Sequence, residues 1–303
     1  MATHSIARPF LIGAAATTLV SCVAGYIWLE QHRSAVLEVY VFALKSGYSM
    51  LIRTPDDQRI LVDGGGNSQV IQRLTDIIPF YSRRIDAIII TNTEGKNVSG
   101  LIDVIERYRV DRVYIPQYTS EELGIASSTD HVHETLIKTV KEKKIPIEEV
   151  GAGDVIPFER QVTAHVLFPE KPDAFPYSKA SAPEVLFSIL YKRNSILFLG
   201  DASKKVQKFV ASSSASVIAD ADVLVVSHSA APANMSSELM HAARPRQLVY
   251  KKTETNASSN KKASHDPLAA ILTEHRFNLK DGSIRIVSDG EHVEVKKAPW
   301  RTL

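Results

Sequence analysis

The side chains best suited to chemistry follow the ends of apolar segments. In "IIITNTEGKNVSGL", residues 88–101, an apolar run leads into a polar stretch whose one strong metal ligand is Glu94. Two other apolar runs, "SILFLGD" and "ADVLVVSH", end at Asp201 and His228. Loops at strand ends often carry catalytic or metal-binding residues. Two carboxylates and an imidazole form a donor set that can hold a divalent metal and activate water.

The other polar residues of the first stretch argue against that chemistry. Asn92 and Asn97 supply only amide oxygens, which are weak zinc ligands, and Lys96 adds a cation. Two or three good ligands are marginal for a metal site, so we expect no bound metal. The ammonium group of Lys96 can instead take the place of an ion by pairing with Glu94 or Asp201.

The elements that must position these residues alternate between strands and helices. Three strands within 36–44, 48–54 and 59–66 predict an antiparallel meander, and Asp63 ends the third. Further strands are expected at 85–91, 112–116, 162–169, 184–191, 195–201, 221–228 and 246–252, and a hairpin at 282–297. Helices are expected at 69–80, 98–108, 204–212, 237–243 and 267–276. Two such blocks predict an α/β (α+β) fold, a four-layer αββα sandwich with two facing sheets between helices.

An uncharged apolar segment precedes this domain. Residues 9–29 form a segment that, as a helix, is about as long as the ~30 Å hydrocarbon core of a bilayer. We therefore expect residues 1–33 to be an N-terminal membrane anchor or uncleaved signal, and residues 34–303 to be one domain. A cleaved signal, a lipoprotein signal ending at Cys22 and an organelle-targeting peptide are alternatives. We expect the protein to span the membrane once, with its folded domain on the extracytoplasmic side.

Composition excludes few classes of binding partner. The formal charge is +2 over 303 residues, and the single cysteine excludes an internal disulfide and a cysteine-based zinc site. Acidic residues interleave with the basic pairs, which favours a solvated surface and leaves nucleic acid as a weaker possibility. These pairs are Arg83-Arg84, Lys143-Lys144, Lys204-Lys205, Lys251-Lys252 and Lys261-Lys262.

Four short motifs, in order along residues 37–296, resemble the metallo-β-lactamase-fold domain of ComEC-type DNA-uptake (competence) proteins. They are "LIRTPDDQRILVDGGG", "ILFLGDAS", "ADVLVVSHSA" and "SHDPLAAILTEH". The resemblance implies the sandwich fold of that hydrolase family and, for the family itself, a metal-dependent nuclease or phosphodiesterase site.

The metal-binding positions depart from the family pattern Thr-His-x-Asp-x-Asp-His-x-x-Gly-Leu. Thr91, Gly100 and Leu101 match this pattern, whereas the residues at the four metal-ligand positions all differ from it. These are Asn92, Glu94, Lys96 and Asn97. The early Asp-Val-Gly-Gln-Gly-Asp motif becomes "ALKSGY", which loses both carboxylates, and a family serine is aligned with Glu184.

Together, these features predict a membrane-anchored pseudoenzyme whose pocket keeps only remnants of a metal site. We expect it to act as a binding or scaffold subunit, with nucleic acid or a partner protein as what it binds. The alternative is an active hydrolase that uses Asp201, His228 and Glu94 with zinc or manganese. The residues expected to line the pocket are Asp63, Asn92, Glu94, Lys96, Asn97, Asp201 and His228.

Overall fold

The computed structural model describes residues 35–125, 130–158, 161–179, 181–226, 234–251 and 275–299, together with Ser21 and Ala24. By its internal contacts the chain divides into two units, Met1–Ala35 and Val36–Leu303. Within the described ranges no helix is both long and apolar enough to cross a membrane. Apart from Ser21 and Ala24, the span predicted over residues 9–29 lies outside those ranges, so it stays a prediction.

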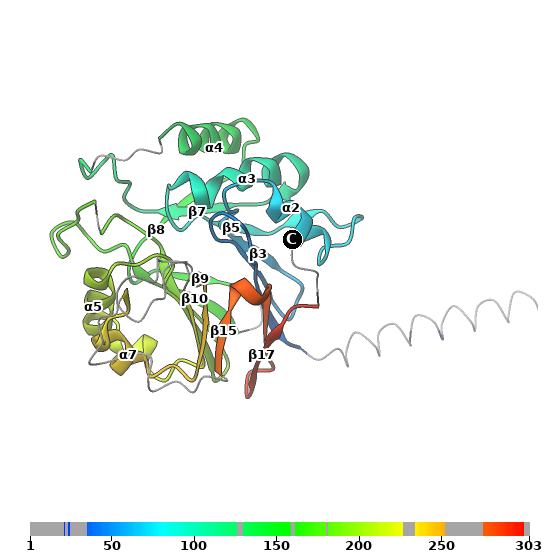
Figure 1. Ribbon diagram of the computed structural model, residues 1–303. Coiled ribbons are helices and arrows are strands. Elements are labelled where there is room, and N and C mark those ends of the chain that lie inside the picture. The colour runs from blue at the N-terminus through cyan, green and yellow to red at the C-terminus, as the bar shows by residue number, and fades with distance from the viewer. Residues whose placement is uncertain are drawn as a thin grey trace, which may run out of the picture. The chain divides into compact units, whose positions relative to one another are not determined.

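Two large sheets form the centre of the second unit (Figure 1). The eight strands of the first are, in spatial order, β17 (Val293–Lys297), β16 (Ile284–Ser288), β1 (Leu37–Val41), β2 (Met50–Arg53), β3 (Arg59–Val62), β5 (Ala87–Ile89), β7 (Val113–Pro116) and β8 (Ile147–Val150). The seven of the second are β15 (Arg276–Asn278), β14 (Gln247–Tyr250), β13 (Val223–Val226), β12 (Asn194–Phe198), β11 (Leu186–Tyr191), β10 (Val162–Phe168) and β9 (Val155–Pro157). A short parallel pair joins β4 (Arg84–Ile85) to β6 (Arg109–Val110).

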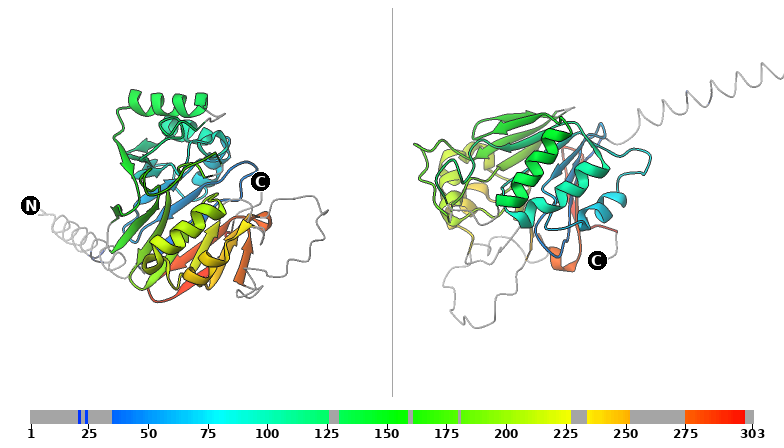
Figure 2. Two further views of the ribbon diagram at one scale, coloured as in Figure 1. Left: turned by 90° about the vertical axis from the view of Figure 1, so that its left-hand side faces the viewer. Right: turned by 90° about the horizontal axis from the view of Figure 1, so that it is seen from above.

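Alternation of side chains along the strands produces three separate apolar cores. Val39, Ile52 and Phe187 belong to the core between the two sheets. Leu51 and Ile88 face the other way and pack with one group of helices, while Leu197 and Leu224 do the same on the second sheet. Because successive strand residues point to opposite faces, each sheet buries both faces. The order of layers is therefore helix, sheet, sheet, helix, as predicted, and Figure 2 shows the helices outside both sheets.

The helices cover the outer faces of the two sheets. On the first sheet lie α2 (Gln69–Thr75), α3 (Gly95–Arg107) and α4 (Asp130–Glu142). On the second lie α5 (Lys204–Ser213), α6 (Ala215–Ile218) and α7 (Ser237–Ala243), and a 3₁₀ turn, η3 (Leu279–Asp281), precedes β16. The antiparallel order of β1, β2 and β3 confirms the predicted meander.

Three predicted helix boundaries are wrong. The first helix ends at Thr75 instead of residue 80, and the turn that follows contains Pro79, a residue that disfavours helix before it. Helix α3 begins at Gly95 instead of residue 98, so Lys96 and Asn97 lie in its first turn. The helix predicted over 267–276 lies outside the described residues up to 274, and Arg276 begins strand β15.

Candidate functional site

A glycine turn fixes the start of α3 against the end of β3. The Gly64 N–H donates to the Asn97 carbonyl oxygen (2.7 Å), and the Gly100 N–H donates to that of Gly65 (3.0 Å). A Cβ atom on Gly100 would lie 2.1 Å from the Gly64 oxygen, and one on Gly64 would lie 2.6 Å from the Leu101 nitrogen. Only glycine fits at both positions, which explains why the "DGGG" and "SGL" segments occur together.

Asp63 belongs to this turn between β3 and α3, and it does not line the cavity that contains Glu94, Lys96 and Asp201. Its side chain is buried, and its backbone has a φ of 53°, a left-handed conformation that aspartate tolerates better than most residues. The carboxyl group accepts hydrogen bonds from the Thr91 N–H (2.9 Å) and hydroxyl (2.6 Å). Burial raises the pKa of Asp63 to about 7, although the bonds from Thr91 oppose the rise. Asp63 thus links the ends of β3 and β5.

The cleft holds an ammonium group between two carboxylates. Lys96 Nζ lies 2.8 Å from Glu94 Oε2 and 3.1 Å from Asp201 Oδ2. All three side chains line a cavity of about 450 Å³ beside the first turn of α5. Burial lowers the pKa of Lys96, but the two carboxylates raise it more, so that its net shift is upward and the side chain is a cation near neutral pH. The sequence predicted that Lys96 pairs with Glu94 or Asp201, and the structure contains both contacts.

The two carboxamides bond to each other behind this cleft. Asn92 Oδ1 accepts from Asn97 Nδ2 (3.1 Å) and from the Glu94 N–H (3.1 Å). Both side chains are buried, and neither lines the cavity. Asn97 Oδ1 is buried without a hydrogen-bond partner among the described residues, and it offers a single weak amide ligand. The polar groups of Asn92 and Asn97 therefore support the loop.

Glu184 is more central than the sequence indicated. Its Oε1 accepts the Asp201 N–H (2.7 Å), and a Cβ atom on Gly200 would lie 1.9 Å from that oxygen. Burial, and then the charge of Asp201, raises the pKa of Glu184 well above its usual range. Burial therefore favours the protonated form of this carboxyl group. The acid immediately before the apolar run of β11 was the available signal for it.

A second lysine, Lys251, approaches from the end of β14. Its Nζ donates to the carbonyl oxygens of Leu44 (2.8 Å) and Gly47 (3.3 Å) and is close enough to Asp201 and Lys96 to feel their charges. Burial lowers the pKa of Lys251, and Asp201 opposes that shift. Sequence reasoning treated this lysine as surface, because nothing in its local pattern distinguishes it from the other basic pairs.

The described donor set does not fit a zinc or manganese ion. Among the residues that the structure describes, no group of three His, Cys, Asp or Glu side chains could hold a metal. Lys96 lies between Glu94 and Asp201, and its ammonium group would repel a cation held by these two carboxylates. His228, the expected imidazole ligand, lies outside the described residues.

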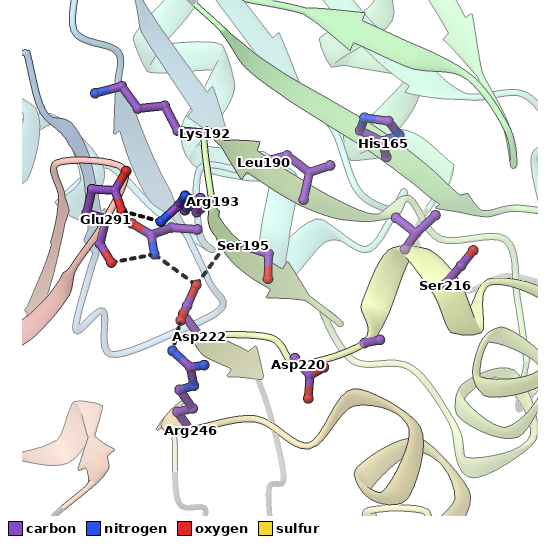
Figure 3. Close-up of a pocket in the computed structure, with 13 residues that line it drawn as sticks. His165, Leu190, Lys192, Arg193, Ser195, Ser216, Asp220, Asp222, Arg246 and Glu291 are labelled. Carbon is purple, nitrogen blue, oxygen red and sulfur yellow. Dashed lines mark hydrogen bonds and ion pairs between the residues drawn. The ribbon is translucent and has the colours of Figure 1, made fainter.

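A second cavity, of about 540 Å³, lies at the other end of β11 and β12 (Figure 3). Asp222 is buried there and accepts from the Ser195 N–H (3.0 Å), Asn194 Nδ2 (3.2 Å) and Arg246 Nη1 (2.9 Å). Arg193, on the rim, pairs with Glu291 at 3.1 Å. These bonds join the starts of β12, β13 and β14, so the charges of this cavity have a structural role.

No protein-family model matches the chain, and no curated protein matches it in sequence. Solved structures that it resembles include unliganded yeast PDE1, at 13% identity and a TM-score of 0.46 over 79% of this chain and 93% of that one. A subclass B3 metallo-β-lactamase from a soil metagenome library matches at 13% identity and 0.42, over 68% and 81%.

A variant of CmlA β-hydroxylase matches at 16% identity and a TM-score of 0.46, over 71% of this chain, which spans 45% of that protein. Similarities at this level do not assign a reaction or a cofactor. The α+β sandwich itself is given by the strand order and the three cores described above.

Proposed function

We propose that residues 34–303 form a metallo-β-lactamase-fold domain of ComEC type whose metal centre has been replaced by a lysine. The observation that carries this proposal is the contact of Lys96 Nζ with both Glu94 and Asp201. On this view the domain is not a hydrolase, and it serves as a binding or scaffold subunit of a membrane complex.

The chemistry of the cleft supports the loss of hydrolysis. Water becomes a strong nucleophile near neutral pH when a bound metal lowers its pKa, which requires several neutral or anionic ligands and an open position. Here Lys96 supplies a fixed positive charge without an open coordination site. Burial raises the pKa of Glu184, which favours its protonated form. Among the described residues, the cleft therefore offers no set of side chains that would hold a metal and activate water.

The proposed setting is a membrane. Residues 9–29 would anchor the chain by a single pass, with the domain on the extracytoplasmic side. The resemblance to DNA-uptake proteins suggests a competence-type assembly, in which the domain contacts a partner protein or nucleic acid. No metal or other cofactor is part of this proposal.

Metal analysis of the full-length chain tests the proposal. We expect substoichiometric zinc and manganese after purification without chelator, and no cleavage of single- or double-stranded DNA when either ion is added. Asp201→Ala should leave that background unchanged, as should Asp220→Ala, a matched change on the exposed surface.

The alternative is an active nuclease or phosphodiesterase that uses Asp201, His228 and Glu94. Stoichiometric metal, together with cleavage that is abolished by chelator and by Asp201→Ala or His228→Ala, would establish it and refute our proposal. Co-purification of a partner, or salt-dependent DNA binding without cleavage, would support a binding role.

A further inference from the structure

Two exposed aromatic residues lie beside arginines at the opposite end of β5 from the cleft. Phe80 and Tyr81 are 82% and 79% exposed, and their rings pack edge to face with centroids 5.5 Å apart. They occupy the turn between α2 and β4. We call this region the aromatic–arginine surface, and it consists of Phe80, Tyr81, Arg83, Arg107 and Arg109. Phe80 and Tyr81 come shortly before Arg83-Arg84, one of the basic pairs of the sequence.

Strand pairing brings the arginines of this surface together. The Arg109 N–H donates to the Arg83 carbonyl oxygen (2.9 Å), and the β4–β6 register sets Arg84 opposite Arg109. The charges of Arg83 and Arg107 both lower the pKa of the Tyr108 hydroxyl. Burial raises that pKa by more, so the net shift is upward. Residues about 25 positions apart therefore meet at one edge.

Part of this positive charge has no carboxylate partner among the residues that the structure describes. Arg84 pairs with Asp111 (2.6 Å) and Asp86 (3.1 Å), and Arg109 bonds to Asp111 (3.1 Å). By contrast, Arg83 and Arg107 are exposed, and no carboxylate of the described residues forms an ion pair with either. The surface therefore combines apolar rings with two guanidinium groups that are available to anions.

A protein partner or a nucleic acid fits this surface less well than a membrane. Stable protein interfaces bury about 1,200–2,000 Å² in all. Beyond Phe80 and Tyr81, however, the only large apolar side chain exposed among the described residues is Val155, in the second sheet. Two unpaired cations would neutralise about two phosphates, which gives weak DNA binding at physiological salt. A lipid surface needs no shape complementarity, and aromatic and basic residues are the types that favour it.

We infer that the aromatic–arginine surface rests on an anionic lipid surface and sets the orientation of the domain. This inference depends on the proposed membrane anchor. Seven residues separate the predicted span from β1, so even a fully extended linker keeps the start of β1 within about 25 Å of the bilayer. Figure 1 shows the turn after α2, in cyan, on the same side of the domain as the start of β1, in dark blue. A tethered domain reaches the bilayer at high effective concentration, so a weak contact suffices.

Fluorescence quenching by brominated lipid in vesicles tests this contact in the full-length chain. Cys22→Ser provides a background without thiols, because Cys22 is the only cysteine. A polarity-sensitive dye is then attached through Tyr81→Cys or, as an exposed control at the start of α7 on the second sheet, through Ser237→Cys. In vesicles that contain phosphatidylglycerol, we expect the dye at 81 to be quenched at least about threefold more than the dye at 237.

Charge reversal tests the role of the arginines. Arg83→Glu with Arg107→Glu should shift the contact equilibrium at least about tenfold toward the unbound state. The matched double change Lys138→Glu with Lys141→Glu, both exposed on α4, should leave it unchanged. Equal effects of the two pairs would contradict a role for these arginines. Circular dichroism and thermal unfolding establish that each variant is folded.

Failure of the anchor and failure of the lipid contact give different results. A chain that does not float with vesicles refutes the anchor and the inference with it. A chain that floats but shows equal quenching at both positions refutes only the lipid contact. Binding of a labelled single-stranded oligonucleotide that is lost with Arg83→Glu and Arg107→Glu, without quenching at 81, would assign the surface to nucleic acid instead.

Discussion

Substitution of Lys96 by methionine tests whether an ammonium group stabilises the cleft. The change keeps the length of the side chain and removes its charge. Asp201, 21% exposed, and Glu94, 51% exposed, then lose the cation at 3.1 Å and 2.8 Å. Asp201 also lies beside the buried Glu184. Removal of the Lys96 charge should therefore destabilise Glu94, Asp201 and Glu184 together.

The expected loss of stability follows from the distance and the exposure. Two unit charges 3.1 Å apart attract by about 5 kcal/mol at an effective dielectric constant of 20, and by about 1.3 kcal/mol in water. Lys96 is 39% exposed, so solvent screens most of the larger value, and exposed pairs contribute only about 0–1 kcal/mol. We expect a loss of about 1–2 kcal/mol, which lowers Tm by about 2–8 °C.

Chemical denaturation and calorimetry at several pH values measure this loss. The folded-state pKa of Lys96 is raised, so its contribution is present below the unfolded-state pKa and disappears only as pH rises through the higher folded value. The difference between variant and wild type should therefore be constant from about pH 6 to 9. Lys204→Met is the matched control, because Lys204 lines the same cavity without a carboxylate partner among the described residues. An equal loss in both variants would refute the reasoning.

Lys96→Asp extends the test to metal binding. A third carboxylate beside Glu94 and Asp201 should destabilise the domain without metal and create a site for Mn²⁺ or Zn²⁺. A ligand at about 100 times its Kd stabilises by about 2.7 kcal/mol, so added metal should raise the Tm of this variant and leave the wild type unchanged. If metal raises the Tm of the wild type equally, Lys96 does not occupy the ion's place.

Three further predictions concern the frame and the second cavity. Because the folded-state pKa of Asp63 is raised to about 7, stability should fall by up to about 4 kcal/mol as pH rises from about 4 to 7, and Asp63→Asn should reduce that slope in urea titrations. Gly100→Ala should cost more than about 3 kcal/mol, because its Cβ would meet backbone at 2.1 Å. Gly95→Ala in the same helix has only contacts of 3.7 Å or more and should be near neutral in thermal unfolding. Asp222→Ala should cost about 2–3 kcal/mol by removing three hydrogen bonds to a buried carboxylate, whereas Asp220→Ala, on the exposed surface, should change Tm little.

The sequence predicted those parts of the site that depend on local pattern. Asp201 and Glu94 each follow a recognisable apolar strand, so their meeting with Lys96 could be expected once the sheets were placed face to face. Lys251 could not, because its partners at Leu44 and Gly47 are more than 200 residues away in sequence. Such a contact depends on how the two sheets pack, which a local pattern does not encode.

The start of α3 and the edge strands were missed for a different reason. Glycine is a poor helix former, so the pattern placed the helix start after Asn97, whereas the structure begins it at Gly95. The strands β8 and β9 are short and carry exposed or polar residues, so their apolar period is weak. Tertiary pairing decides such segments, and in these cases it outweighed propensity.

The persistence of the loop is explained by what it joins. Acids from both sheets gather at this end of the strands, and buried acids must be neutralised or paired. Here Asp63 and Glu184 are shifted toward their protonated forms by burial, and Asp201 is paired with Lys96. The Val185 N–H donates to the Thr91 carbonyl oxygen (2.7 Å), so the same loop also links the second sheet to the first. Lys96 supplies a positive charge beside Asp201, and the loop supplies the fixed turn that joins the two sheets.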